Sequence, residues 1–185
     1  MDTANIRRKL KLIFLTGLLT GIFLCPLGIF IYVKSGHMPV TTDDAPMPFE
    51  KFIARSAIHV AAEKEKNLQP RAPITDAQLK NGAHLFVNHC AGCHGLIDSP
   101  HSKMAAALYP PAPQLFKADD LVTDDPVGII HWKIKNGIRL TGMPAFKTIL
   151  SDDEMWEISA VLQQADKLSE PVKAELTLSV LRSRH

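Results

Sequence analysis

This chain of 185 residues has few cysteines, a small net charge and no long alternating strand pattern. Three cysteines are too few for a disulfide scaffold, which needs many more in a shorter chain. A formal net charge of +2 argues against a nucleic-acid-binding protein, which would carry a strongly basic face. No apolar/polar alternation is long enough to predict a β-strand, and no internal repeat occurs. The absence of a strand pattern therefore favours an all-α protein.

A long uncharged segment lies near the N-terminus. Leu12–Val33 contains no charged side chain, and a helix of this length spans about 33 Å, enough for the hydrocarbon core of a bilayer. Only Lys34 follows it closely, whereas four cations precede it: Arg7, Arg8, Lys9 and Lys11. The positive-inside rule then predicts an anchor in the inner (cytoplasmic) membrane, with the later residues facing the periplasm.

Two other interpretations of this segment stay open. A cleaved signal peptide is one, but the run is long for a signal sequence and no small-x-small cleavage site follows. Lipidation at Cys25 is the other, but Phe23 and Leu24 before it are not the small residues that such a site needs. Each interpretation exports the remaining chain.

The exported part predicts a connector followed by a helical domain. Capping boxes at Thr75 and Ser151 each predict the start of a helix, and Pro126–Lys135 is a further helix candidate. We expect an all-α domain in a chain divided into four parts: a cytoplasmic stub and anchor (1–34), a linker with a short helix (35–74), the domain (75–168) and a tail (169–185).

The linker helix is expected over Phe49–Asn67. Its apolar residues recur at helical spacing: Phe49, Phe52, Ile53, Ala57 and Val60. It could be a stalk, a strut against the domain or a docking surface, and we favour the strut.

Cys90-Ala91-Gly92-Cys93-His94 is the C-x-x-C-H signature of covalent c-type haem attachment. Thiols one helical turn apart can form thioether bonds to the two vinyl groups of one porphyrin, and His94 then lies below the iron as the proximal ligand. A structural zinc site needs four protein ligands, and no second cysteine pair exists. A thioredoxin-like pair would accompany a βαβ pattern, which is absent. One motif predicts one haem c, with Cys90 and Cys93 as its attachment points.

Met143 is the expected distal ligand. It lies in a Gly/Pro-bounded loop, Thr141-Gly142-Met143-Pro144, which suits a fixed thioether better than core filling. Met104 and Met155 lie in helix-prone segments and are expected to be ordinary apolar residues. Four histidines are alternatives, of which we retain the last two: His84, His89, His101 and His131.

These residues resemble the class I monohaem c-type cytochromes in their membrane-anchored bacterial form. The resemblance covers about Thr75–Lys167 and rests on the haem motif, the Gly142-Met143-Pro144 loop, and a Gly82-x-x-x-Phe86 pattern. It implies that Gly82 lies opposite Trp156 where the first and last helices cross. It also implies that a proline carbonyl orients His94, and Pro113 fits this role, with Pro110 and Pro111 as alternatives.

A six-coordinate His94/Met143 iron leaves no open position for a substrate, so we expect an electron-transfer protein and not an enzyme. Its expected partners are redox proteins: a membrane complex or a periplasmic dehydrogenase. Two alternatives are an electron-entry subunit of a larger membrane oxidoreductase, and a haem peroxidase or sensor. Four cations near Met143 could steer an acidic partner: Lys133, Lys135, Arg139 and Lys147. Alternatively Arg139 or Trp132 binds a haem propionate, and the lysines are only solvated.

Overall fold

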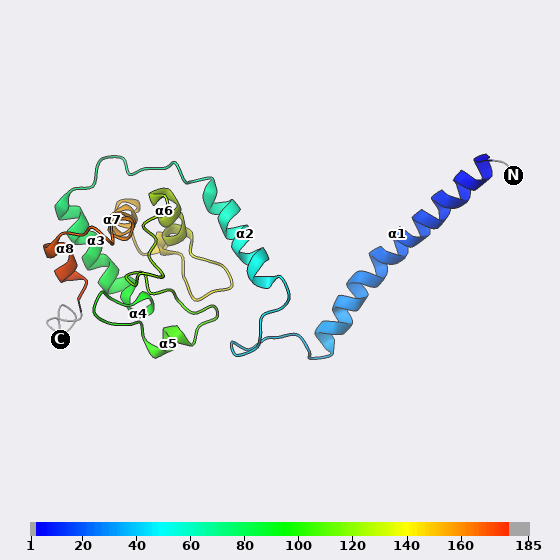
Figure 1. Ribbon diagram of the computed structural model, residues 1–185, viewed down its shortest axis with the longest axis horizontal. Helices are drawn as coiled ribbons and strands as arrows, with labels where there is room; N and C mark the ends of the chain where they lie inside the picture. The colour runs from blue at the N-terminus through cyan, green and yellow to red at the C-terminus, as the bar shows by residue number, and fades with distance from the viewer. Residues whose placement is uncertain (1–2, 178–185) are drawn as a thin grey trace. The chain divides into compact units, whose positions relative to one another are not determined.

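The computed structural model describes residues 3–177, and the chain divides into two compact units at Met47/Pro48. No strand occurs in the described part of the chain. Its helices, shown in Figure 1, are α1 (Thr3–Lys34), α2 (Glu50–Glu63), α3 (Asp76–His89), α4 (Ala91–His94), α5 (Lys103–Ala106), α6 (Val127–Asn136), the 3-10 helix η1 (Phe146–Thr148), α7 (Asp152–Gln163) and α8 (Glu170–Glu175). The all-α prediction is confirmed.

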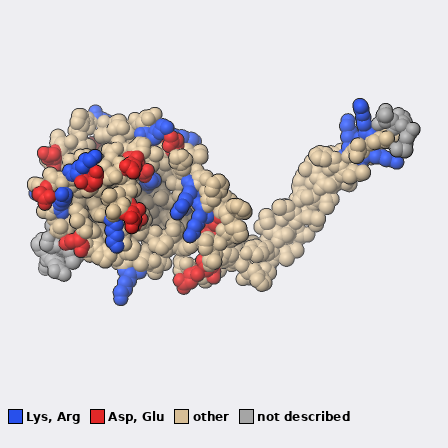
Figure 2. Space-filling view, in the orientation of Figure 1, with Lys and Arg blue, Asp and Glu red and all other residues tan. Residues whose placement is uncertain are grey.

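The first unit contains α1, a single helix that is long and apolar enough to cross a membrane. Its apolar side chains are exposed, and Figure 2 shows the basic side chains gathered at its N-terminal end. Such a helix cannot bury its surface within its own unit, which fits a helix that has lipid as its environment.

The second unit is built around α3, α6 and α7, with α7 in contact with both of the others. Both predicted capping boxes are present: Thr75 accepts from Gln78 N, and Ser151 accepts from Glu154 N. The core contains the apolar faces of these helices, including Phe86, Ile158 and Val161.

Two segments outside the predicted domain also pack on it. Helix α2 contacts α6, and Ala62 is buried there. Helix α8, in the segment assigned from sequence to the tail, packs on α3 and buries Val172 and Leu176 in the same core. The Leu176 carbonyl also accepts a hydrogen bond from Ile97 N at 3.2 Å, in the loop after the haem motif.

Candidate functional site

The C-x-x-C-H motif forms a helical turn at the end of α3. Cys93 N and His94 N both donate to the Cys90 carbonyl, at 3.0 and 2.9 Å. Cys90 is buried and Cys93 is exposed, and neither is in a disulfide. The local helix thus holds two thiols and one imidazole within a single turn, as the spacing predicts.

Burial raises the pKa of Cys90 to about 12, with the neighbouring Cys93 adding to the effect. A thioredoxin-like dithiol centre accompanies βαβ units, and the described residues contain no strand. Nor do three His, Cys, Asp or Glu side chains gather around a metal position anywhere in residues 3–177, as a structural zinc site would require.

The His94 imidazole is held by Pro113, whose carbonyl oxygen lies 2.8 Å from Nδ1. Of the three candidate prolines, Pro113 makes this contact. A carbonyl only accepts, so Nδ1 carries the proton and Nε2 keeps its lone pair. Burial lowers the pKa of His94, the Pro113 hydrogen bond opposes that change, and His101 adds a small lowering effect. The neutral ring is therefore the form of His94 that can ligate a metal.

Gly95 fixes the chain just after His94. Its φ of +73° favours glycine, and an added Cβ would lie 2.9 Å from both Ser99 O and His101 N. The 99–102 segment folds back over the motif, with Ser102 N donating to Gly92 O at 3.4 Å. His101 is thus on the same loop that covers the His94 end of the motif.

The loop that carries Met143 is fixed by its own backbone. Ile138 N donates to the Met143 carbonyl at 3.2 Å, and Met143 N donates to Thr141 Oγ1 at 3.1 Å. Gly137 has φ +64°, and an added Cβ would lie 2.7 Å from Met143 O. Met143 is partly buried against the hydrophobic core, whereas Met104 is exposed and Met155 is core. Gly137 is not among the residues predicted for the site, although a glycine directly after a helix end is a recognisable signal in the sequence.

The helix crossing predicted for Gly82 differs in detail. A Cβ on Gly82 would lie 2.5 Å from Glu157 O and 3.1 Å from Ile158 N, so the close approach is to the α7 backbone beside Trp156 and not to the Trp156 ring. That ring instead stacks on His131, with centroids 3.9 Å apart and planes 7° apart.

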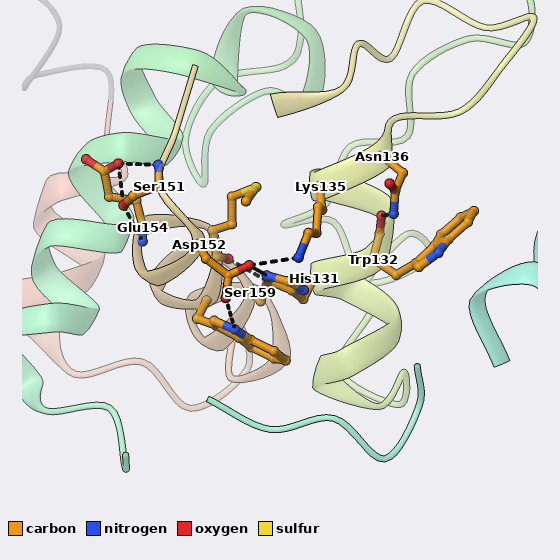
Figure 3. Close-up of polar contacts among 10 residues, drawn as sticks. His131, Trp132, Lys135, Asn136, Ser151, Asp152, Glu154 and Ser159 are labelled. Carbon is orange, nitrogen blue, oxygen red and sulfur yellow. Dashed lines mark hydrogen bonds and ion pairs between the residues drawn. The ribbon is translucent and has the colours of Figure 1, made fainter. Parts of the chain in front are cut away.

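The imidazole of His131, retained from sequence as an alternative distal ligand, is therefore held by contacts with α7. It is buried, and its Nε2 lies 3.3 Å from Asp152 Oδ1. Figure 3 shows His131 and Lys135 converging on this carboxylate, and Trp156 Nε1 donates to its second oxygen at 3.1 Å. Burial lowers the pKa of His131, an effect that Asp152 opposes. Asp152 is not among the residues predicted for the site, because only the folded chain brings its carboxylate beside His131.

Two of the four cations near Met143 have carboxylate partners. Lys133 lies 2.7 Å from Asp125, and Lys135 lies 3.0 Å from Asp152. Arg139 and Lys147 are exposed. On the face shown in Figure 2, acidic and basic side chains are interspersed over the folded unit.

These donors fit a covalently bound haem: two thiols and a neutral imidazole share one turn, and a thioether is presented from a fixed loop. Residues 77–160 also match the family model described as cytochrome C oxidase, cbb3-type, subunit III. Residues 77–160 form a cytochrome c domain. No curated protein matches the chain. A cytochrome c domain implies covalently bound haem c and electron transfer, and all four predicted site residues lie within the matched segment.

Proposed function

We propose that this protein is a membrane-tethered monohaem cytochrome c that carries electrons between redox proteins. In this proposal Cys90 and Cys93 attach one haem c, His94 is the proximal ligand and Met143 is the distal ligand. The observation that carries it is the 2.8 Å contact between His94 Nδ1 and Pro113 O, which leaves Nε2 as the only ligating nitrogen of that ring.

The distal assignment is supported by the surroundings of its competitors. His131 is stacked on Trp156 and faces Asp152, so it would have to leave both to bind an iron. The His101 backbone packs on Gly95, beside the proximal residue. His84 and His89 are exposed on α3. Met143 remains the residue that is both partly buried and fixed by backbone hydrogen bonds.

When bound, such a haem supplies a reversible one-electron Fe(III)/Fe(II) couple whose potential a Met/His ligand pair raises. The protein residues hold the imidazole in one tautomer, hold the thioether in one loop conformation, and exclude water through the surrounding core. With both axial positions filled by protein ligands, the proposed iron leaves no site for a substrate, which favours a carrier over an enzyme.

Membrane topology is the second part of the proposal. The cations at the N-terminal end of α1 favour a cytoplasmic N-terminus and a periplasmic haem domain, tethered to the inner membrane through Leu12–Val33. The predicted organisation then becomes an anchor (1–34), a linker (35–74), a haem domain (75–168) and a C-terminal tail (169–185) whose α8 packs on α3.

The description of the matching family favours a second candidate, an electron-entry subunit of a larger membrane oxidoreductase. Purification from detergent with stoichiometric companion subunits would support this candidate, and a solitary chain would count against it. For either role, Arg139 and Lys147 are the cations still available to steer an acidic partner. An electron-transfer rate independent of ionic strength would remove that steering.

Carbon monoxide tests the ligand set. We expect the ferrous spectrum of the wild-type protein to be unchanged by carbon monoxide, because both axial positions are occupied. Met143→Ala should open the distal position and bind carbon monoxide, while Met104→Ala, which changes an exposed methionine, should behave as wild type. Binding by the wild-type protein would instead favour a peroxidase or sensor.

A further inference from the structure

Helix α2 leaves its apolar face uncovered within the described chain. Phe52, Ile53 and Val60 are 70%, 63% and 64% exposed, and Phe49 just before the helix is 75% exposed. The side of α2 that packs on α6 buries Ala62. The chain that follows α2 also approaches the α6 backbone, since a Cβ added to Gly128 would lie 3.0 Å from Leu68 O. The strut that sequence analysis favoured therefore carries a second, apolar surface pointing away from the domain.

This surface is one-sided and continuous. Spacings of one and seven residues place Phe52, Ile53 and Val60 on one face of α2, with Ala57 between them, and the exposed Phe49 directly precedes the helix. Phe49 adopts φ +65°, a conformation that bulky residues rarely adopt. No burial inside the domain offsets that strained backbone, because the Phe49 ring is exposed.

The position of α2 along the chain selects the occupant. Fifteen residues separate the end of α1 at Lys34 from the start of α2 at Glu50, and a fully extended chain of that length reaches about 50 Å at most. In an anchored protein the start of this helix therefore stays within about 50 Å of the end of α1. Aromatic and branched apolar side chains on one face of a helix are typical of helices that lie in a lipid interface. The charges of α2 are balanced, with Glu50 and Glu63 beside Lys51 and Arg55, so its apolar face is the feature that favours lipid.

We propose that α2 is an interfacial helix, which rests its Phe49–Phe52–Ile53–Val60 face on the outer surface of the membrane that holds α1. This inference depends on the proposed anchoring. It implies that α2 lies between the membrane surface and α6, the helix on which α2 packs.

Photo-crosslinking of the full holoprotein in phosphatidylcholine vesicles tests this contact. The photoreactive p-benzoylphenylalanine replaces Phe52, and intact mass after illumination measures the fraction of chains that gain one phospholipid. We expect a fraction several times larger than with the same group in place of Ala118, an exposed residue in a polar loop. Adding Ile53→Ser and Val60→Ser should lower the yield at position 52, and an unchanged Soret band would show that the domain stays folded.

Other results of the same experiment would refute the α2 contact or test the anchor separately. A yield at position 52 no higher than at position 118 overturns the proposal, and so does a mass of two protein chains, which would assign this face to a second copy. The same group in place of Phe14 in α1 tests the anchor separately, because lipid adducts there without adducts at 52 refute only the α2 contact. The haem mass on the same chains reports attachment independently.

Discussion

Replacing Gly82 by alanine should push α3 and α7 apart. An added Cβ would lie 2.5 Å from Glu157 O and 2.6 Å from Glu157 C, and both are backbone atoms that cannot rotate away. Overpacking of this kind costs up to about 3 kcal/mol. Alanine recovers about 1 kcal/mol through its helix propensity, so the net loss in unfolding free energy is about 2 kcal/mol.

Thermal denaturation of the holoprotein, followed by far-ultraviolet circular dichroism, measures this loss. For a domain of this size, 2 kcal/mol lowers Tm by roughly 6 to 10 °C. Gly17→Ala is the control, because it lies in α1, outside the folded domain, nothing lies within 4 Å of its added Cβ, and the Tm of the domain should stay the same. A Gly82→Ala variant as stable as Gly17→Ala would contradict the close contact between α3 and α7.

Three other outcomes follow from the same structure. Lowering the pH from about 6.5 should reduce the unfolding free energy. Burial lowers the pKa of His131 in the folded state, so the unfolded chain binds the proton first. His131→Phe, which can still stack on Trp156, should flatten this part of the pH profile of the unfolding free energy, measured by urea denaturation. Ser151→Ala should lower the unfolding free energy by about 1 kcal/mol in the same assay, because it removes the α7 cap. An unchanged unfolding free energy would show that the cap does not stabilise the protein. Asn81→Ala should destabilise by about 1 to 3 kcal/mol, since Glu157, buried at 8% exposure, loses its 2.6 Å hydrogen bond. Asn136→Ala, at the exposed C-terminal end of α6, should change the unfolding free energy little.

Local signals predicted the helices that frame the site. Thr75 and Ser151 marked the starts of α3 and α7 because a side-chain oxygen three residues before a Gln or Glu satisfies free backbone N–H groups, and the structure contains both caps. The haem motif was equally local, since one helical turn brings its thiols and imidazole together.

Contacts between distant segments were less accessible from sequence. Apolar periodicity predicted the helix around Phe52, but it did not predict which face of that helix packs on the domain. The packed face contains the small Ala62, next to a close backbone approach at Gly128, while the larger Phe52 and Ile53 stay exposed. The close crossing at Gly82 meets the α7 backbone at Glu157, one residue after Trp156, and the Trp156 ring stacks on His131. Helical spacing does not report that an imidazole 25 residues earlier stacks on this ring. Lys133 and Lys135 acquired carboxylate partners from Asp125 and Asp152, which only the folded chain brings near.

Near-infrared magnetic circular dichroism of the oxidised holoprotein decides whether His94 and Met143 are the axial ligands, because its charge-transfer band identifies the axial ligand pair of a low-spin ferric haem. We expect a single histidine–methionine band that disappears in Met143→Ala and persists in Met104→Ala. A bis-histidine or high-spin signal in the wild-type protein, or a colourless preparation, would contradict the proposed haem ligation.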